Sequence, residues 1–162
     1  MSDAEELNER SYPRSLVKGL LAGLIGGLVA TAAKSVAEKI YPPRTHGEPE
    51  PPAVLAEKVA GHELTGAQQA VAAEAIHWGF GALTGAAYGV LAEYYPAATQ
   101  QDGAAFGTAL DSLTHKTALP ALGLSSEPGE QTMREKTSEM ATHVVYGVVT
   151  ETVRRFVRKM LA

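Results

Sequence analysis

The chain has 162 residues, a length that suits a single domain. It carries 14 basic and 18 acidic residues, and this slightly acidic balance gives no electrostatic reason to bind nucleic acid. Because the chain contains no cysteine, a disulfide scaffold, a thiol nucleophile and thiolate metal sites are all excluded.

The predicted elements are all helical. Residues 1–14 are polar and acidic and are expected to form a tail before a single helical domain that covers 15–162. Prolines divide this domain, since a proline inside a helix removes a backbone hydrogen bond and clashes with the preceding turn. Four main helices are predicted at about 15–41, 66–95, 103–119 and 132–161, and a short amphipathic helix at 53–64. No strand-like alternation of polar and apolar residues occurs, so the fold class is all-α.

The long helices contain rows of glycine at four-residue steps. This spacing places the members of a row on one helical face. In water a glycine inside a helix costs about 1 kcal/mol relative to alanine, whereas in lipid small residues let helix backbones approach closely. The rows are therefore predicted to be helix-packing faces, and their members are Gly19, Gly23, Gly27, Gly81, Gly85, Gly89, Gly103, Gly107 and Gly147.

Uncharged stretches predict that the four helices form a membrane-spanning bundle. Lys18 and Lys34 enclose fifteen uncharged residues, which rise about 22 Å. A hydrocarbon core is about 30 Å thick, so the lysine stems are expected to reach towards the interfaces. The third helix contains Asp111, His115 and Lys116 and is expected to face protein or water rather than lipid. The alternative is a soluble bundle whose helices cross closely at Gly and Ala.

The cellular location and the partners are predicted from the charges near the helix ends and from the glycine rows. The segment RRFVRK at 154–159 favours a cytoplasmic C-terminus, and an even number of spans then puts the N-terminus on the same side of the inner membrane. The stretch VATAA at 29–33 resembles a signal-peptide cleavage site, but the acidic tail before it lacks a basic n-region. Membrane lipid is the expected partner, and self-association into a homo-oligomer is predicted because the glycine faces exceed what four short helices need to bury.

Four segments carry a family resemblance. They are GLLAGLIGGLVATAAKSVAEKIYPPR (19–44), HWGFGALTGAAYGVLAEYYP (77–96), THKTALPALGL (114–124) and SEMATHVVYGVVTETVRRFVRK (138–159). In these segments the chain resembles the YagU family of small bacterial inner-membrane proteins, whose biochemical role is not established. The resemblance implies a polytopic inner-membrane protein and carries over no catalytic residue. This chain is richer in Ala and Gly and poorer in aromatic residues, and its connection after the first helix is shorter.

Three histidines within helices each follow an acidic residue by one turn. The pairs are Glu74 with His77 at i,i+3, and Asp111 with His115 and Glu139 with His143 at i,i+4. These separations put both members of a pair on one helical face. The same faces carry the glycine rows, so the imidazoles are expected to point into the bundle.

Three functions remain open for this histidine and carboxylate cluster. Ionisable groups within a membrane suggest a proton or ion path, and because imidazole titrates near neutral pH, pH response or proton or ion conduction is the leading hypothesis. The second candidate is a metal or haem site, since imidazoles are common ligands of transition metals, although no cofactor is predicted outright. The third is a purely structural role in a membrane organiser. No nucleophile motif or phosphate-binding loop occurs, so no enzymatic activity is predicted.

Overall fold

The computed structural model describes residues 13–44 and 47–162. Its elements are α2 (Leu16–Ile40), α3 (Pro51–Ala60), α4 (Gly66–Tyr94), the 3₁₀ segment η1 (Pro96–Gly103), α5 (Ala104–Leu113), the π-helical segment η2 (Thr114–Ala118), α6 (Leu119–Ala121) and α7 (Met133–Met160). These described residues contain helices and no strand, so the all-α prediction is confirmed for them. Most of the predicted polar tail lies outside the described residues.

Local sequence signals set the ends of the long helices. Ser15 caps α2 by accepting a hydrogen bond from the amide of Lys18. Thr65 and Thr132 each begin a capping box with the residue three positions later, Gln68 before α4 and Glu135 before α7. A capping side chain of this kind typically stabilises a helix by about 1 kcal/mol. The predicted boundaries of these three helices therefore agree with the structure to within one or two residues.

The third predicted helix is interrupted in the structure. Helix α5 ends at Leu113, and the amide of Leu119 then bonds to the carbonyl oxygen of Thr114, five residues earlier. Pro120 explains the change, because it has no N–H to offer the preceding turn and its ring requires extra room there. A wider π turn provides that room. The Thr117 hydroxyl also donates to the carbonyl of Ser112, five residues earlier.

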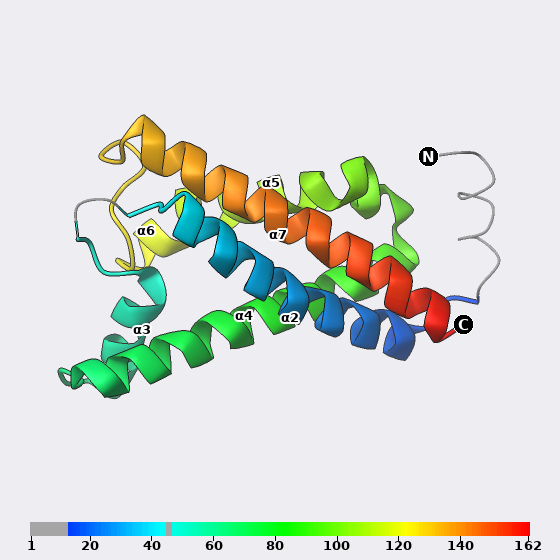
Figure 1. Ribbon diagram of the computed structural model, residues 1–162, viewed down its shortest axis with the longest axis horizontal. Helices are drawn as coiled ribbons and strands as arrows, with labels where there is room; N and C mark the ends of the chain where they lie inside the picture. Colours follow the sequence, from blue (N-terminus) through cyan, green and yellow to red (C-terminus); the bar gives the residue numbers. More distant parts are fainter. Residues whose placement is uncertain (1–12, 45–46) are drawn as a thin grey trace.

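Helix α2 packs along both α4 and α7, α5 lies along α7, and α3 lies against α4 (Figure 1). The chain runs along the bundle four times, through α2, then α4, then the series α5, η2 and α6, and finally α7. The start of α2 and the ends of α4 and α7 share one end of the bundle, where Glu93 accepts hydrogen bonds from the Ser15 amide and the Arg158 guanidinium. We call this the C-terminal end and the opposite one the far end.

Glycine brings the backbones of α2 and α4 into direct contact. An ideal Cβ atom on Gly23 would lie 2.2 Å from the carbonyl oxygen of Gly85, and one on Gly89 would lie 2.1 Å from that of Gly19. Real Cβ atoms do not approach so closely, so a larger residue would push the two helices apart. Gly27 and Gly81 belong to the same contact, with a Cβ on Gly27 falling 2.4 Å from the oxygen of Gly81.

A second glycine contact joins α5 to α7. A Cβ on Gly107 would lie 2.2 Å from the carbonyl oxygen of His143, and one on Gly147 would lie 2.3 Å from that of Gly103. Gly26, which the sequence analysis did not single out, packs against the backbone of Thr150 between α2 and α7. Glycine therefore occupies the closest contacts of three helix pairs.

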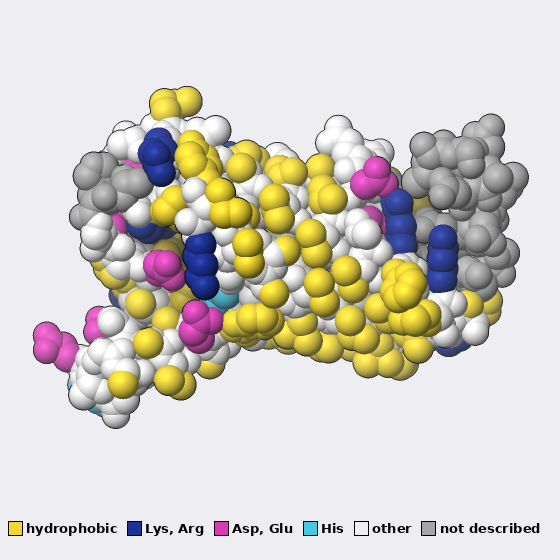
Figure 2. All heavy atoms as spheres, in the orientation of Figure 1, with side chains coloured by type: hydrophobic (Ala, Val, Ile, Leu, Met, Phe, Trp, Pro, Cys, Tyr) yellow, Lys and Arg dark blue, Asp and Glu magenta, His cyan; other side chains and the backbone are white. Residues whose placement is uncertain are grey.

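Polarity is inverted between the inside and the outside of the bundle. Many large apolar side chains are exposed, among them Leu16, Val17, Leu21, Ile25, Val29, Phe80, Leu83, Leu91 and Phe156. The buried side chains include many polar ones, among them Thr31, Asp111, Ser138, Glu139, Thr142, His143, Thr150, Glu151 and Arg154. Figure 2 shows hydrophobic side chains across the middle of one face, while charged side chains gather towards its two ends.

One helix has the length and composition of a membrane span. Among the described residues, α2 is the one helix long and apolar enough to cross a bilayer. A core helix of a soluble protein and a signal sequence can satisfy the same criterion, so this observation alone is weak evidence for a membrane. The four-span prediction is therefore not confirmed, although its helical part is.

Candidate functional site

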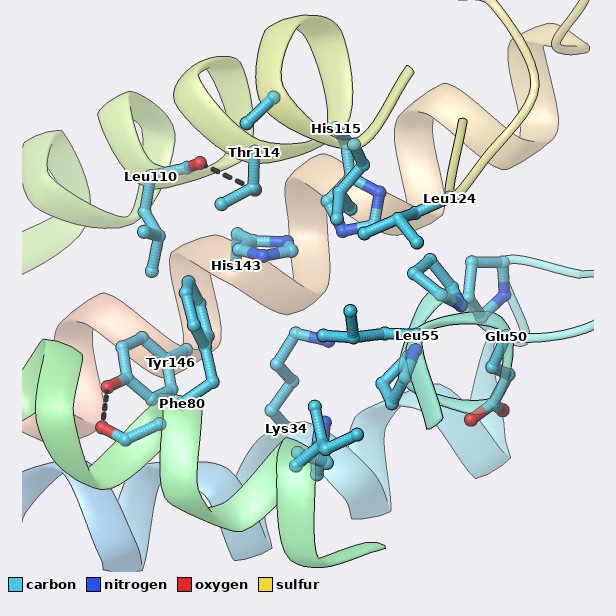
Figure 3. Close-up of a pocket in the computed structure, with 18 of the residues that line it drawn as sticks. Lys34, Glu50, Leu55, Phe80, Leu110, Thr114, His115, Leu124, His143 and Tyr146 are labelled. Atoms are coloured by element: carbon cyan, nitrogen blue, oxygen red, sulfur yellow. Dashed lines mark hydrogen bonds between the residues drawn. The ribbon is translucent and has the colours of Figure 1, made fainter. Parts of the chain in front are cut away.

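A cavity of about 300 Å³ lies at the far end of the bundle. The three histidines predicted as candidates line it, His77 from α4, His115 from η2 and His143 from α7. The other walls come mainly from α2, α3 and the segment after α2. Figure 3 shows His115 and His143 beside each other and Lys34 reaching towards them from α2. The fold thus brings these three imidazoles, from separate parts of the chain, around one space.

His115 and His143 form the closest pair. Their ring centroids lie 4.9 Å apart and the rings meet edge to face. The Nδ1 atom of His143 is 2.8 Å from the carbonyl oxygen of Glu139. Because a carbonyl oxygen can only accept, His143 donates from Nδ1, and in the neutral ring Nε2 is then an acceptor.

The carboxylates pair with histidines of the neighbouring helix rather than with those one turn along their own. Glu139 of α7 places Oε1 3.1 Å from Nδ1 of His115, and Asp111 of α5 places Oδ1 3.9 Å from Nδ1 of His143. Asp111 also forms an ion pair with Lys116 at 3.0 Å. Acids and histidines that the sequence places together on one helical face therefore meet partners across the contact between α7 and the series α5–η2.

Glu74 and His77 are not partners in the structure. Glu74 is exposed and accepts a hydrogen bond from Trp78 Nε1 at 3.0 Å. His77 instead places Nε2 3.3 Å from the hydroxyl of Ser35 on α2. Of the six predicted site residues, the three histidines line the cavity, Asp111 and Glu139 contact two of them from outside its lining, and Glu74 does neither.

Two cations that the sequence analysis did not single out as site residues also line the cavity. Arg44 pairs with Glu139, its Nη2 lying 3.0 Å from Oε1, and only 9% of its side chain is exposed. Its Nη1 is buried and has no hydrogen-bond partner among the residues that the structure describes. Lys34 forms an ion pair with Glu38, one turn along α2. Arg44 could not be predicted, because it follows Pro43 in an irregular segment whose path depends on the packed bundle.

Comparison with known proteins places the chain in a family. Residues 28–152 match a family described as "Protein of unknown function (DUF1440)". The chain belongs to the DUF1440 family. No curated protein and no solved structure matches it. The DUF1440 match includes every histidine, carboxylate and cation of the cavity described above.

The DUF1440 chain has a second buried polar cluster near its C-terminal end. Glu151 is fully buried and accepts a hydrogen bond from Tyr88 at 2.8 Å. Arg154 and Arg155 each donate to its carboxylate at 2.6 Å, and Arg155 also reaches Asp102 at 2.9 Å. The spacing of Glu151 to both arginines, three and four residues, was the sequence signal for this cluster.

Metal ligation was tested on the same geometry. In the described parts of the chain, no group of three or more His, Asp and Glu side chains is arranged to hold a metal ion. The three histidines of the DUF1440 cavity surround a space and do not converge on a point within it. No specific observation therefore favours the metal or haem hypothesis over the other two.

Proposed function

We propose that this DUF1440 protein is a polytopic inner-membrane protein whose histidine-lined cavity changes its packing with pH. The four passes through the bilayer would be α2, α4, the series α5–η2–α6, and α7. The resemblance of four segments to the YagU family of inner-membrane proteins supports this location. The shared end of the bundle for the start of α2 and the end of α7 supports an even number of passes. The basic segment 154–159 would place that end on the cytoplasmic side.

The observation that carries the membrane proposal is the inverted polarity of the bundle. A protein in water lowers its free energy by burying large apolar side chains, yet many of them lie on the outside here. A bilayer removes that penalty, and it penalises polar side chains unless they face protein. The buried polar residues of α7 satisfy this requirement.

Helix length also supports more than one pass. Helix α4 has 29 residues and α7 has 28, so each is about 42–44 Å long and exceeds the hydrocarbon core of about 30 Å. Mean hydropathy takes no account of where a side chain points. Mean hydropathy therefore underestimates how well α7 could span a membrane, because charged groups such as Glu139, Glu151 and Arg154 are buried within the bundle.

The charges around the His115 and His143 rings support the pH response. Protonation of His115 or His143 would place a positive charge beside the other ring, with Arg44, Lys34 and Lys116 nearby. The facing acidic groups are Glu139, Asp111, Glu38 and Glu50. A change in the charge of either imidazole would upset this balance and alter the packing of α5 and η2 on α7.

Conduction through a single chain has less support than pH response. Between the cavity and the C-terminal end, the backbones of α2 and α4 are in contact at the glycine rows. Tyr146 also closes the interior there, donating a hydrogen bond to the carbonyl oxygen of Gly81 at 2.6 Å. A path between copies in a homo-oligomer is a separate possibility that flux measurements in liposomes would detect.

The test uses Trp78, the one tryptophan of the chain. It directly follows His77 on α4, so its fluorescence in liposomes is expected to report a change in how α4 packs beside the cavity as the pH is lowered from 8. A Glu74→Gln background removes the carboxylate that contacts the indole. The transition is expected to be lost in His115→Gln/His143→Gln and retained in the control His62→Gln, whose histidine is exposed and outside the cavity. An unchanged transition in the double variant would overturn the proposal.

A further inference from the structure

We infer that the cavity binds the head group of an anionic single-chain amphiphile, specifically a carboxylate carrying an apolar chain. The inference rests on the proposed membrane location, because the chain of such a ligand is taken to enter from the bilayer. It does not depend on the pH response. Three observations support it: an unsatisfied buried cation, an apolar wall, and the size of the space.

The unsatisfied cation is Arg44. Its side chain is more than nine-tenths buried, it lines the cavity, and Glu139 contacts only one side of the guanidinium group. Nη1 is left without a hydrogen-bond partner. A buried donor without a partner is energetically costly, and guanidinium groups bind carboxylates strongly through charge-assisted hydrogen bonds. A ligand oxygen at Nη1 would remove that cost.

The remaining charges limit the ligand to at most one negative charge, because Arg44 is itself paired with Glu139. The cavity is lined by two cations, Arg44 and Lys34, and by two acids, Glu38 and Glu50. Lys34 is already paired with Glu38. Arg44 is therefore the cation with an open donor, which suits a monoanionic head better than a dianion. The imidazole nitrogens around the cavity add donors or acceptors for a second ligand oxygen.

Apolar side chains form much of the remaining wall. They are Leu55, Ile76, Phe80, Leu110, Leu119, Leu122 and Leu124. Phe80 and Leu122 are also exposed on the outside of the molecule, by 51% and 62%. The apolar wall is thus continuous with the surface that would face lipid. A chain bound by its head at Arg44 can lie along this wall and continue into the bilayer.

The size of the space limits the ligand. A cavity of about 300 Å³ lies at the lower limit of small-molecule sites, about 300–1,000 Å³. It can take a head group and the first part of one chain, and it is too small for the body of a two-chain lipid.

The test measures binding of a doxyl-labelled stearate to the full-length protein in nonionic detergent, from the immobilised component of its electron paramagnetic resonance spectrum. Dodecanoate is expected to displace the probe, whereas dodecanol and acetate at the same concentration are not. Arg44→Gln is expected to weaken binding about tenfold or more, because a charge-assisted hydrogen bond is lost. Arg44→Lys, which keeps the charge, is expected to retain part of the affinity.

The matched control is Arg134→Gln, whose guanidinium group lies over the Tyr41 ring and outside the cavity. It is expected to bind like the wild type, and circular dichroism establishes that each variant is folded. Equal binding by wild type and Arg44→Gln would overturn the inference, as would equal displacement by dodecanol. If acetate displaces the labelled stearate, the site binds small free anions, and this result would overturn the inference that the ligand is an amphiphile. Binding with a flat Trp78 pH profile would overturn only the pH proposal.

Discussion

Gly23 of α2 and Gly85 of α4 bring two helix backbones so close that a Cβ atom on Gly23 would lie 2.2 Å from the Gly85 carbonyl oxygen. This contact fixes the position of α4 against α2, and therefore the position of His77 relative to Lys34 and Ser35. The cavity at the far end of the bundle thus depends on packing that begins near its middle.

Two glycines of α4 give a matched test of this packing. Gly85→Ala is expected to destabilise the protein by about 1–3 kcal/mol, because the methyl group has no room against Gly23 and Gly27. Gly79→Ala meets no atom within 4 Å and is expected to be neutral or to stabilise α4 by up to about 1 kcal/mol. Thermal unfolding in mild detergent measures both. Equal effects would show that the close contact is not formed.

Removing the charge of Glu139 is expected to destabilise the cavity strongly. Glu139→Gln leaves the buried Arg44 guanidinium without its anion and removes the carboxylate beside His115. Breaking one member of a buried ion pair typically costs about 3–5 kcal/mol. The exposed Glu63→Gln is the control and is expected to change stability little. A Glu139→Gln variant as stable as this control would contradict the described pairing.

At the C-terminal end, Arg155 contacts two carboxylates, the buried one of Glu151 and the exposed one of Asp102. Glu151→Gln is expected to cost about 3–5 kcal/mol, since Glu151 is fully buried against Arg154 and Arg155. Asp102, whose side chain is 66% exposed, is expected to contribute about 0–1 kcal/mol. Chemical denaturation of Glu151→Gln and Asp102→Asn measures the difference. A larger loss of unfolding free energy in Asp102→Asn than in Glu151→Gln would contradict the buried position of Glu151.

A charge on the outer face separates a lipid environment from water. Leu83 of α4 is 71% exposed, and in water Leu83→Lys would be harmless. In a bilayer, a lysine near the middle of a span costs about 2.5–3.5 kcal/mol on insertion scales, so less protein is expected to reach the membrane. Val59→Lys on α3, also highly exposed, is the control. Equal membrane yields of both variants would count against α4 as a span.

The sequence predicted what depends on local periodicity. Prolines located the ends of the long helices, and glycine at four-residue steps identified faces that the structure has in contact. The interruption of the third helix was also present in the sequence, as Pro120, but its form was not. A proline requires some break, and whether the helix widens, bends or ends depends on what packs around it.

What the sequence could not predict depends on the register between helices. A separation of four residues puts Glu139 and His143 on one face, but the position of α7 along α5 decides which imidazole the carboxylate meets. In the structure that partner is His115. Arg44 was missed for a similar reason, since a residue outside any helix has no periodic signal.

The central claim, that the bundle lies in a bilayer with its polar side chains inward, is tested most directly by extraction of cell membranes with alkaline carbonate. The account predicts that the full-length protein stays in the membrane pellet and is released only by detergent. Recovery of the protein in the carbonate supernatant, folded and free of lipid, would contradict it.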